Sequence, residues 1–156
     1  MTELRRLRDN EHEYIKDDPV RPHFSYEWRT FSGREVWTLT NEQDQPDAII
    51  CVAFTNEIPT NEWELELYSQ AAHQEGQHGS IAVFYTVWSY RAGAGQEIVN
   101  GIAKHLYEHY PWLNRWVTLS PLTEMAERFH IKNGATLLAR HVDCQNFDYT
   151  HTLIKN

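Results

Sequence analysis

The chain has 156 residues, and its 41% hydrophobic and 13% aromatic side chains are typical of one globular domain, not of a disordered chain. It carries 22 acidic and 14 basic side chains, and the net charge of −8 disfavours a general nucleic-acid binder, which neutralises phosphates with lysine and arginine. The longest apolar run, residues 48–54, is far shorter than the roughly 20 residues that a membrane-spanning helix needs.

The first 22 residues are polar and alternate in charge sign, with Pro19 and Pro22 at the end of the segment. This pattern predicts a solvated helix or arm ahead of a single domain over residues 23–156. The segment contains no apolar stretch like that of a secretory signal, and two cysteines make no disulfide framework. We therefore expect a reduced, cytoplasmic protein with no membrane partner and no nucleic-acid partner.

Strands and one helix alternate through the middle of the chain. Residues 35–40 alternate in polarity, residues 47–54 are almost wholly apolar as in a central strand, and residues 79–89 show the strongest strand pattern. Between the last two, residues 60–73 predict a helix with Thr60 as its N-cap, although its Trp-Glu-Leu-Glu-Leu run also fits a short strand.

The second half of the chain alternates more regularly. Residues 96–110 place apolar side chains on one face at helical spacing and end before a proline, and residues 115–119 form a short buried strand. A serine-proline pair opens a helix over residues 121–132, and two strands, 135–141 and 147–154, close the chain. This order of elements predicts a mixed α/β sheet with helices on both faces.

A strand, a glycine-rich loop and the start of a helix follow one another over residues 85–99. Backbone amides at a helix N-terminus attract anions, glycine lets the backbone approach a phosphate closely, and a neighbouring arginine adds positive charge. The loop therefore predicts a pyrophosphate cradle, with a flexible strand-to-helix turn as the alternative, and it matches neither a Walker loop nor Gly-x-Gly-x-x-Gly. The candidate binding residues are Arg91, Gly93, Ala94, Gly95 and Gln96.

Ser120 and His130 form a second candidate group. Ser120 follows an apolar strand, at the strand end where ligands bind in open α/β sheets, and His130 lies near the end of the helix that follows. A hydroxyl donor and an imidazole acid or base are a suitable pair for catalysis. From these residues alone, the favoured interpretation is structural, with Ser120 as the N-cap of the helix and His130 as a boundary histidine.

His105, Glu108 and His109 match the His-x-x-Glu-His pattern of inverted zinc metalloproteases, since two histidines four residues apart on a helix can share a metal. A glutamate ligand further along the chain would also be needed, and only Glu124 and Glu127 follow. Both histidines flank the apolar face of the helix that follows the glycine loop, and packing of that face already accounts for this helix. We therefore expect no metal site.

Taken together, these motifs resemble the acyl-CoA-binding half of the GNAT N-acetyltransferase fold. The usual GNAT loop is Gln/Arg-x-x-Gly-x-Gly/Ala; Gly93 and Gly95 fit it, whereas position 90 is tyrosine and the arginine follows one residue later. Many GNAT enzymes also have a tyrosine four residues before the glycine that matches Gly134, where it protonates the CoA thiolate. This chain has His130 at that position.

A closer resemblance is to malonyl-CoA decarboxylase, whose catalytic domain is GNAT-like. Residues 82–87 are similar to that family's strand before its CoA loop. Residues 110–121 resemble its Phe-Pro-x-Leu…Leu-Ser-Pro signature, and residues 129–135 resemble its Phe-His-Leu-x-Asn-Gly-Ala signature. The serine and histidine of these signatures are that family's catalytic pair, which implies the same roles for Ser120 and His130.

The chain also departs from that family. A short N-terminal segment stands in place of a helical domain, and ten residues separate the two signatures where the family has a long helical insert. Glycine near position 93 replaces an acidic residue common in the family's CoA loop. These differences leave open another acyl-CoA substrate, or transfer in place of decarboxylation.

The resemblance implies conversion of malonyl-CoA to acetyl-CoA and carbon dioxide, with no cofactor beyond the CoA moiety of the substrate. Ser120 and the amide at the start of the 121–132 helix would stabilise the enolate oxygen, and His130 would protonate the enolate carbon as general acid. Two alternatives stay open: a GNAT-type N-acyltransferase acting on an amine, and a non-catalytic acyl-CoA-binding module. A homodimer also stays open, since the sequence does not decide the oligomeric state.

Overall fold

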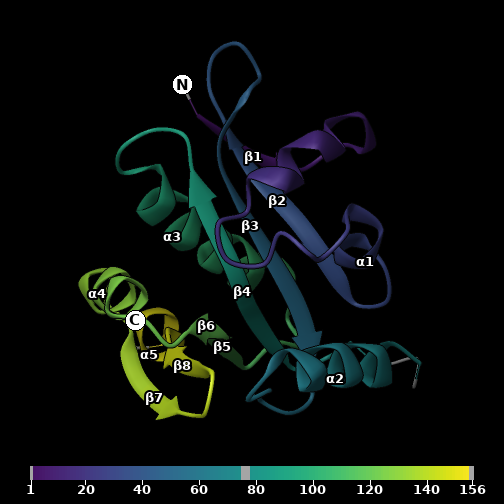
Figure 1. Cartoon of the computed structure of the whole chain (residues 1–156), viewed down its shortest axis with the longest axis vertical. Coiled ribbons are helices and arrows are strands. Elements are labelled where there is room, and N and C mark those ends of the chain that lie inside the picture. The colour runs from purple at the N-terminus through teal and green to yellow at the C-terminus, as the bar shows by residue number, and fades with distance from the viewer. Residues whose placement is uncertain (1, 75–77, 155–156) are drawn as a thin grey trace.

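The computed structural model describes residues 2–74 and 78–154, which build one eight-stranded sheet with helices on both faces (Figure 1). The strand order is β1-β2-β3-β4-β5-β8-β6, and β7 pairs with β8 outside this path. The strands are β1 Glu3–Arg6, β2 Arg34–Thr40, β3 Pro46–Thr55, β4 Ile81–Ser89, β5 Arg115–Thr118, β6 Ser120–Pro121, β7 Thr136–Arg140 and β8 Cys144–Asp148. The helices are the 3-10 helix η1 Asp9–Asp17, α1 Tyr26–Thr30, α2 Glu62–Gln74, α3 Ala94–His109, α4 Glu124–Lys132 and α5 Thr150–Ile154. Within the described residues, no helix is long and apolar enough to cross a bilayer.

The sheet is antiparallel except where β4 and β5 run parallel, so the predicted mixed α/β class is confirmed. Residues 81–84 pair with residues 115–118, and the Leu119 amide donates a further bond to the Phe84 carbonyl at 2.9 Å. β4 continues to Ser89, whereas the chain after Leu119 turns away to pair with β8 through β6. The two strands therefore part beyond Phe84, at the carboxyl end of β5 where open α/β sheets bind ligands.

Each face of the sheet has its own buried core. On one face, α3 fully buries Ile98, Ile102 and Leu106, because these positions recur at helical spacing along one side of the helix. The other face is covered by η1, α1 and α2, and Leu65 of α2 is fully buried there. The helix predicted over residues 60–73 is therefore confirmed as α2, and the strand alternative for this segment is wrong. The predicted N-cap, Thr60, is also wrong, because Asn61 Oδ1 accepts the Glu64 amide at 2.8 Å.

The sequence predicts a solvated helix or arm at the N-terminus, but in the structure this segment adds a strand to the sheet and packs over one of its faces. β1 pairs antiparallel with β2, and both Leu7 and Ile15 are buried. A buried ion pair between Arg29 Nη1 and Asp18 Oδ2, 2.7 Å apart, holds the segment onto the rest of the domain. The sequence pattern did not indicate β1 because an edge strand with charged side chains reads like a solvated segment.

The helix α4 begins later than the sequence predicts. The prediction over residues 121–132 placed its first turn at the serine-proline pair, but Ser120–Pro121 form β6 and pair with β8. The N-cap is Thr123, whose hydroxyl oxygen accepts the Ala126 amide at 3.2 Å. The structural alternative for Ser120, an N-cap, is therefore wrong, and so is the use of an amide at the start of a 121–132 helix.

The last predicted strand, residues 147–154, is also divided differently. β8 ends at Asp148, and α5 follows from Thr150. The carboxylate of Asp148 accepts the Thr150 amide at 2.8 Å, which satisfies an amide at the start of the helix. This local capping contact ends the strand, because the hydrogen bond favours a turn over continued extension.

Candidate active site

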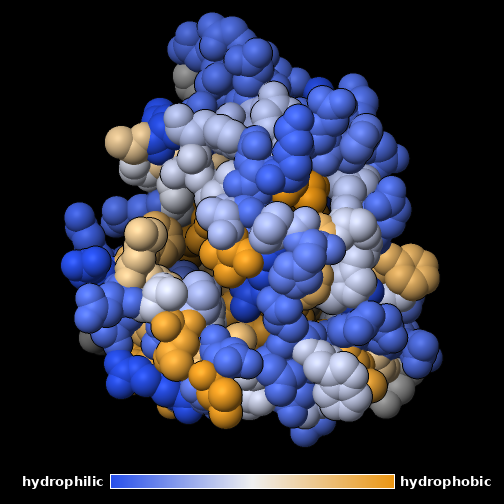
Figure 2. All heavy atoms as spheres, in the orientation of Figure 1, coloured by the Kyte–Doolittle hydropathy of each residue, from blue (hydrophilic) through white to orange (hydrophobic). Residues whose placement is uncertain are grey.

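A cavity of about 660 Å³ lies where β4 and β5 part, and it is the candidate site. β4, α4, residues 120–123, the first turns of α3 and residues 19–20 of the N-terminal segment enclose it. Figure 2 shows hydrophobic surface between the sheet and α4, set in a mostly hydrophilic face. None of the described lining residues is Asp, Glu, Lys or Arg. The lining residues are Pro19, Val20, Phe84, Tyr85, Thr86, Val87, Trp88, Ser89, Gly95, Val99, Ser120, Pro121, Thr123, Met125, Ala126, Phe129 and His130.

The glycine loop enters α3 at the edge of this cavity. Gly93 is the N-cap with φ of +82°, a left-handed conformation that favours glycine. A Cβ on Gly95 would lie 3.4 Å from Phe129 Cε1, so glycine lets α3 approach α4 closely. Ala94 donates its amide to the Arg91 carbonyl at 3.2 Å, whereas no described residue accepts the amides of Gly95 and Gln96. These two amides are the part of the predicted cradle that is free to bind an anion.

The side chain of Arg91 is held by two carboxylates. Its Nε lies 2.9 Å from Asp47 Oδ2, and its Nη2 lies 3.0 Å from Glu97 Oε2. These ion pairs join the end of β4 to β3 and to the first turn of α3. Of the five residues predicted for the cradle, only Gly95 lines the cavity in the described part of the chain. Arg91 therefore stabilises the loop geometry in this structure.

Ser120 lines the cavity from β6, and its side chain is buried. Its Oγ lies 2.8 Å from Thr118 Oγ1, and that oxygen accepts the Phe147 amide at 3.0 Å. Either hydroxyl can be the donor in this contact, and one arrangement has Thr118 donating its hydrogen to Ser120 Oγ. The hydrogen of Ser120 is then available to a ligand in the cavity.

His130 lines the same cavity from the last turn of α4 and is 6% exposed. Its Nδ1 lies 2.7 Å from Tyr149 Oη, and its ring stacks on Phe147 with centroids 5.2 Å apart. Burial lowers the pKa of His130 to about 4, so the imidazole is neutral at pH 7. Ser120 and His130 thus line the same cavity, although no hydrogen bond joins the two side chains.

Sequence reasoning missed the partner of His130. Tyr149 is buried, and its Oη accepts a hydrogen bond from Asn133 Nδ2 at 3.4 Å in addition to its contact with Nδ1 of His130. Burial raises the pKa of the Tyr149 phenol, which keeps it protonated. The signal available in the sequence was Asn133, which lies in the 129–135 signature, whereas Tyr149 falls inside the strand predicted over residues 147–154.

The N-terminal segment closes one side of the cavity through a buried carboxylate. Asp18 Oδ1 accepts the amides of Val20 and Arg21 at 2.8 and 2.9 Å and the Thr86 hydroxyl at 3.0 Å. The guanidinium of Arg21 donates to the carbonyl of Tyr85, the extra residue of a β-bulge in β4. The segment is thereby fixed to β4 beside the cavity.

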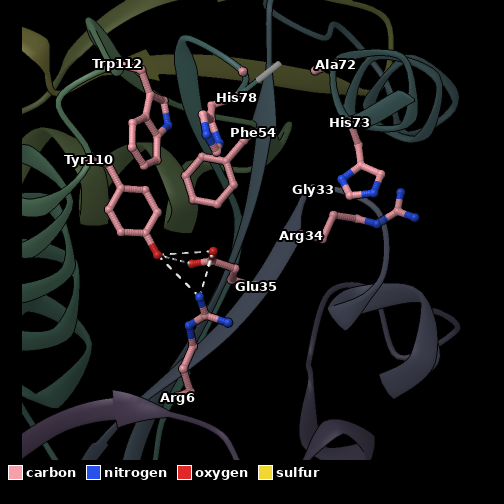
Figure 3. Close-up of a pocket in the computed structure, with 11 residues that line it drawn as sticks. Arg6, Gly33, Arg34, Glu35, Phe54, Ala72, His73, His78, Tyr110 and Trp112 are labelled. Carbon is pink, nitrogen blue, oxygen red and sulfur yellow. Dashed lines mark hydrogen bonds and ion pairs between the residues drawn. The ribbon is translucent and has the colours of Figure 1, made fainter. Parts of the chain in front are cut away.

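A second cavity, of about 470 Å³, lies at the other end of the sheet, near the starts of β2 and β4 (Figure 3). His78 stacks on Trp112 there with ring centroids 4.0 Å apart. The Glu35 carboxylate accepts a hydrogen bond from Tyr110 and pairs with Arg6 at 2.8 Å. None of the predicted site residues lines this cavity, and its carboxylate is already paired.

The two histidines of the His-x-x-Glu-His pattern contact each other on α3. The rings of His105 and His109 are 4.4 Å apart, and His105 also packs on Trp37. Burial, together with the neighbouring His109, lowers the pKa of His105. Within residues 2–74 and 78–154, no group of three or more His, Cys, Asp or Glu side chains is placed to hold a metal ion.

No protein-family model matches the sequence, and no curated protein matches it. Among solved structures, malonyl-CoA decarboxylases from Agrobacterium vitis and Cupriavidus metallidurans match 82% and 83% of this chain, with TM-scores of 0.63 and 0.58 and identities of 21% and 20%. This chain spans 35% and 33% of the length of those two proteins. A spermidine N-acetyltransferase from Vibrio cholerae matches 99% of this chain and 98% of its own length, with a TM-score of 0.65 and 10% identity. The chain therefore has the fold of the GNAT acetyltransferases.

Proposed function

We propose that this chain is an acyl-CoA enzyme that decarboxylates malonyl-CoA, or a closely related β-carboxy thioester, to acetyl-CoA and carbon dioxide. The observation that carries the proposal is the placement of Ser120 and His130 on one apolar cavity beside the N-terminus of α3. The resemblance of residues 110–121 and 129–135 to decarboxylase signatures supports the same pair. No cofactor beyond the CoA moiety is required, because the thioester itself accepts the electron pair.

Decarboxylation breaks the bond between the carboxylate carbon and the α-carbon of the acyl group. The electron pair stays on the substrate and delocalises onto the thioester oxygen as an enolate, which a proton then quenches at carbon. Donors placed where this negative charge develops are usually the largest catalytic contribution. We assign this role to the hydroxyl of Ser120 and to the Nε2–H group of neutral His130.

The character of the cavity favours loss of a carboxylate over transfer to an amine. A malonyl carboxylate finds no Lys or Arg among the described lining residues, and loss of carbon dioxide moves its unpaired charge to the thioester oxygen, where Ser120 and His130 can donate hydrogen bonds to it. An amine acceptor would need a carboxylate to hold its cation and a base to take its proton. The described lining contains neither Asp nor Glu, and its imidazole, His130, is assigned above as a hydrogen-bond donor.

We assign the CoA pyrophosphate to the N-terminus of α3. The amides of Gly95 and Gln96 have no described protein acceptor, and the helix dipole adds partial positive charge at the same point. Gly95 also lines the cavity, so a pyrophosphate bound here lies beside the route by which the thioester enters. Arg91 supports this site from outside the cavity through its ion pairs.

The test is mass spectrometry of malonyl-CoA incubated with the purified full chain, with no amine present. We expect acetyl-CoA to form, and Ser120→Ala and His130→Gln each to lower kcat by roughly 10²- to 10³-fold. Ser80→Ala and His12→Gln change the same residue types outside the cavity and are expected to keep wild-type activity. Unchanged malonyl-CoA with the wild-type chain, or full activity in both cavity variants, would refute the proposal.

A GNAT-type N-acyltransferase is the second candidate. The near-complete coverage of both chains in the match to the spermidine N-acetyltransferase favours it. An amine-dependent release of free thiol from acetyl-CoA, with no decarboxylation of malonyl-CoA, would support transfer. A tight complex with acyl-CoA and no turnover under either condition would support a binding module.

A further inference from the structure

We propose that Tyr149, itself held by Asn133, fixes His130 in the neutral tautomer that carries its hydrogen on Nε2. The tautomer follows from the contacts of the three side chains, and its catalytic consequence rests on the function proposed above. Tyr149 is thus a positioning residue that acts on the substrate through His130.

The hydrogen-bond inventory of the three side chains favours one tautomer. The Nδ2 group of Asn133 can only donate, so Tyr149 Oη is the acceptor of that bond. A phenol has one hydrogen, and the only other described partner of Tyr149 Oη is His130 Nδ1, 2.7 Å away. If Tyr149 Oη also accepted from Nδ1, its own hydrogen would have no described acceptor, so we infer that Tyr149 donates to Nδ1. A neutral imidazole with an unprotonated Nδ1 carries its hydrogen on Nε2.

The surroundings keep the ring neutral, so that a single hydrogen is shared between its two nitrogens. His130 is almost fully buried, with Phe129 and Phe147 against its ring, and no carboxylate contacts it among the described residues. Because Nδ1 is occupied by Tyr149, Nε2 is the nitrogen left to the cavity that His130 lines. The cavity therefore receives an N–H donor and not a lone pair.

This arrangement supplies both the hydrogen bond and the proton that the reaction needs. The Nε2–H group donates to the thioester oxygen as negative charge develops there. As the new C–H bond forms at the enolate carbon, the Nε2–H bond breaks and the Tyr149 hydroxyl proton moves to Nδ1. The negative charge of the enolate thereby passes for the moment to the Tyr149 oxygen, which accepts a hydrogen bond from Asn133 Nδ2. After product leaves, that proton returns to Tyr149, and water in the cavity protonates Nε2 and leaves as hydroxide, which combines with the released carbon dioxide as bicarbonate. The imidazole thus never becomes an anion, and the net proton comes from water.

The tautomer can be measured without any activity, by two-bond ¹H–¹⁵N correlation spectra of the labelled full chain at pH 7. The His130 signals are assigned by their loss in His130→Gln. We expect a protonated Nε2 in the wild-type chain, in roughly tenfold or greater excess over the other tautomer, as one hydrogen bond of about 1.4 kcal/mol provides. Tyr149→Phe is expected to give both tautomers, whereas Tyr107→Phe, an exposed tyrosine outside the cavity, keeps the wild-type spectrum.

A wild-type spectrum with protonated Nδ1 would overturn the inference without any variant, and so would an unchanged tautomer ratio in folded Tyr149→Phe. In the decarboxylation assay, Tyr149→Phe is expected to lower kcat on the order of 10²-fold with KM unchanged. A loss that appears only in KM would contradict the positioning role. If the spectra agree and the wild-type chain leaves malonyl-CoA unchanged, the proposed function fails while the assignment of the tautomer stands.

Discussion

The burial of His130 predicts a specific loss of stability in acid. Its pKa is lowered to about 4 in the folded chain, whereas the ordinary value of an exposed imidazole is 6.5. The unfolded chain therefore takes up this proton at a higher pH than the folded chain does. The resulting contribution to stability is fully present above pH 6.5 and is lost as the pH falls from 6.5 towards 4.

The difference between the two pKa values corresponds to a loss of about 3 kcal/mol in unfolding free energy below pH 4. At pH 4.5 most of this loss, about 2.5 kcal/mol, is already expected. Urea denaturation at pH 7.5 and pH 4.5 measures it, with His130→Gln as the comparison because the other titrating groups cancel between the two chains. The exposed histidine variant His12→Gln serves as the control and should follow the wild-type chain.

The refuting result is equally specific. If the wild-type chain and His130→Gln lose the same free energy between the two pH values, the imidazole is not held neutral by burial. The donor role of Nε2 at neutral pH would then lose its physical basis. A larger loss in the wild-type chain, by about 2.5 kcal/mol, supports the buried neutral ring that both proposals use.

Other contacts around the cavity predict further outcomes. Asp18→Asn leaves a buried guanidinium without its carboxylate and should lower the unfolding free energy by about 3–5 kcal/mol in urea denaturation; an effect no larger than that of exposed Asp143→Asn would contradict this. Gly93→Ala places a side chain at a φ of +82° and should cost about 1 kcal/mol by the same method, a cost near zero being the contrary result. Gly95→Val presses a branched side chain against α4 and should weaken acetyl-CoA binding about tenfold in calorimetry. An unchanged affinity would show that the CoA pyrophosphate does not bind at the N-terminus of α3.

The strand and helix pattern of most of the chain could be read from local periodicity. Residues 96–110 show their apolar face because helical spacing is a property of neighbouring residues, and the buried strand at 47–54 shows itself by its continuous apolar side chains. The same reading placed Gly95, Ser120 and His130 near the ends of strands and helices. The structure brings all three to one cavity.

The short and charged elements could not be read in this way. The sequence of β1 is typical of a solvated segment, because its pairing with β2 uses backbone groups and does not require apolar side chains. Ser120–Pro121 looks like a helix start, since Ser-Pro is a common N-terminal signature, but pairing with β8 draws it into the sheet. In both cases a tertiary contact overrides the local preference.

The sequence by itself determined the class of the fold and the position of the glycine loop, because each depends on residues close together in the chain, and its resemblance to a known family implied Ser120 and His130 as candidate site residues. Only the tertiary structure decided what those side chains touch. β8 lies between β5 and β6, so Tyr149 at its end meets His130 from α4, and the buried Asp18 meets Thr86 on β4. Burial and hydrogen-bond partners set the pKa and tautomer of an imidazole, and both arise from contacts across strands that no local period encodes.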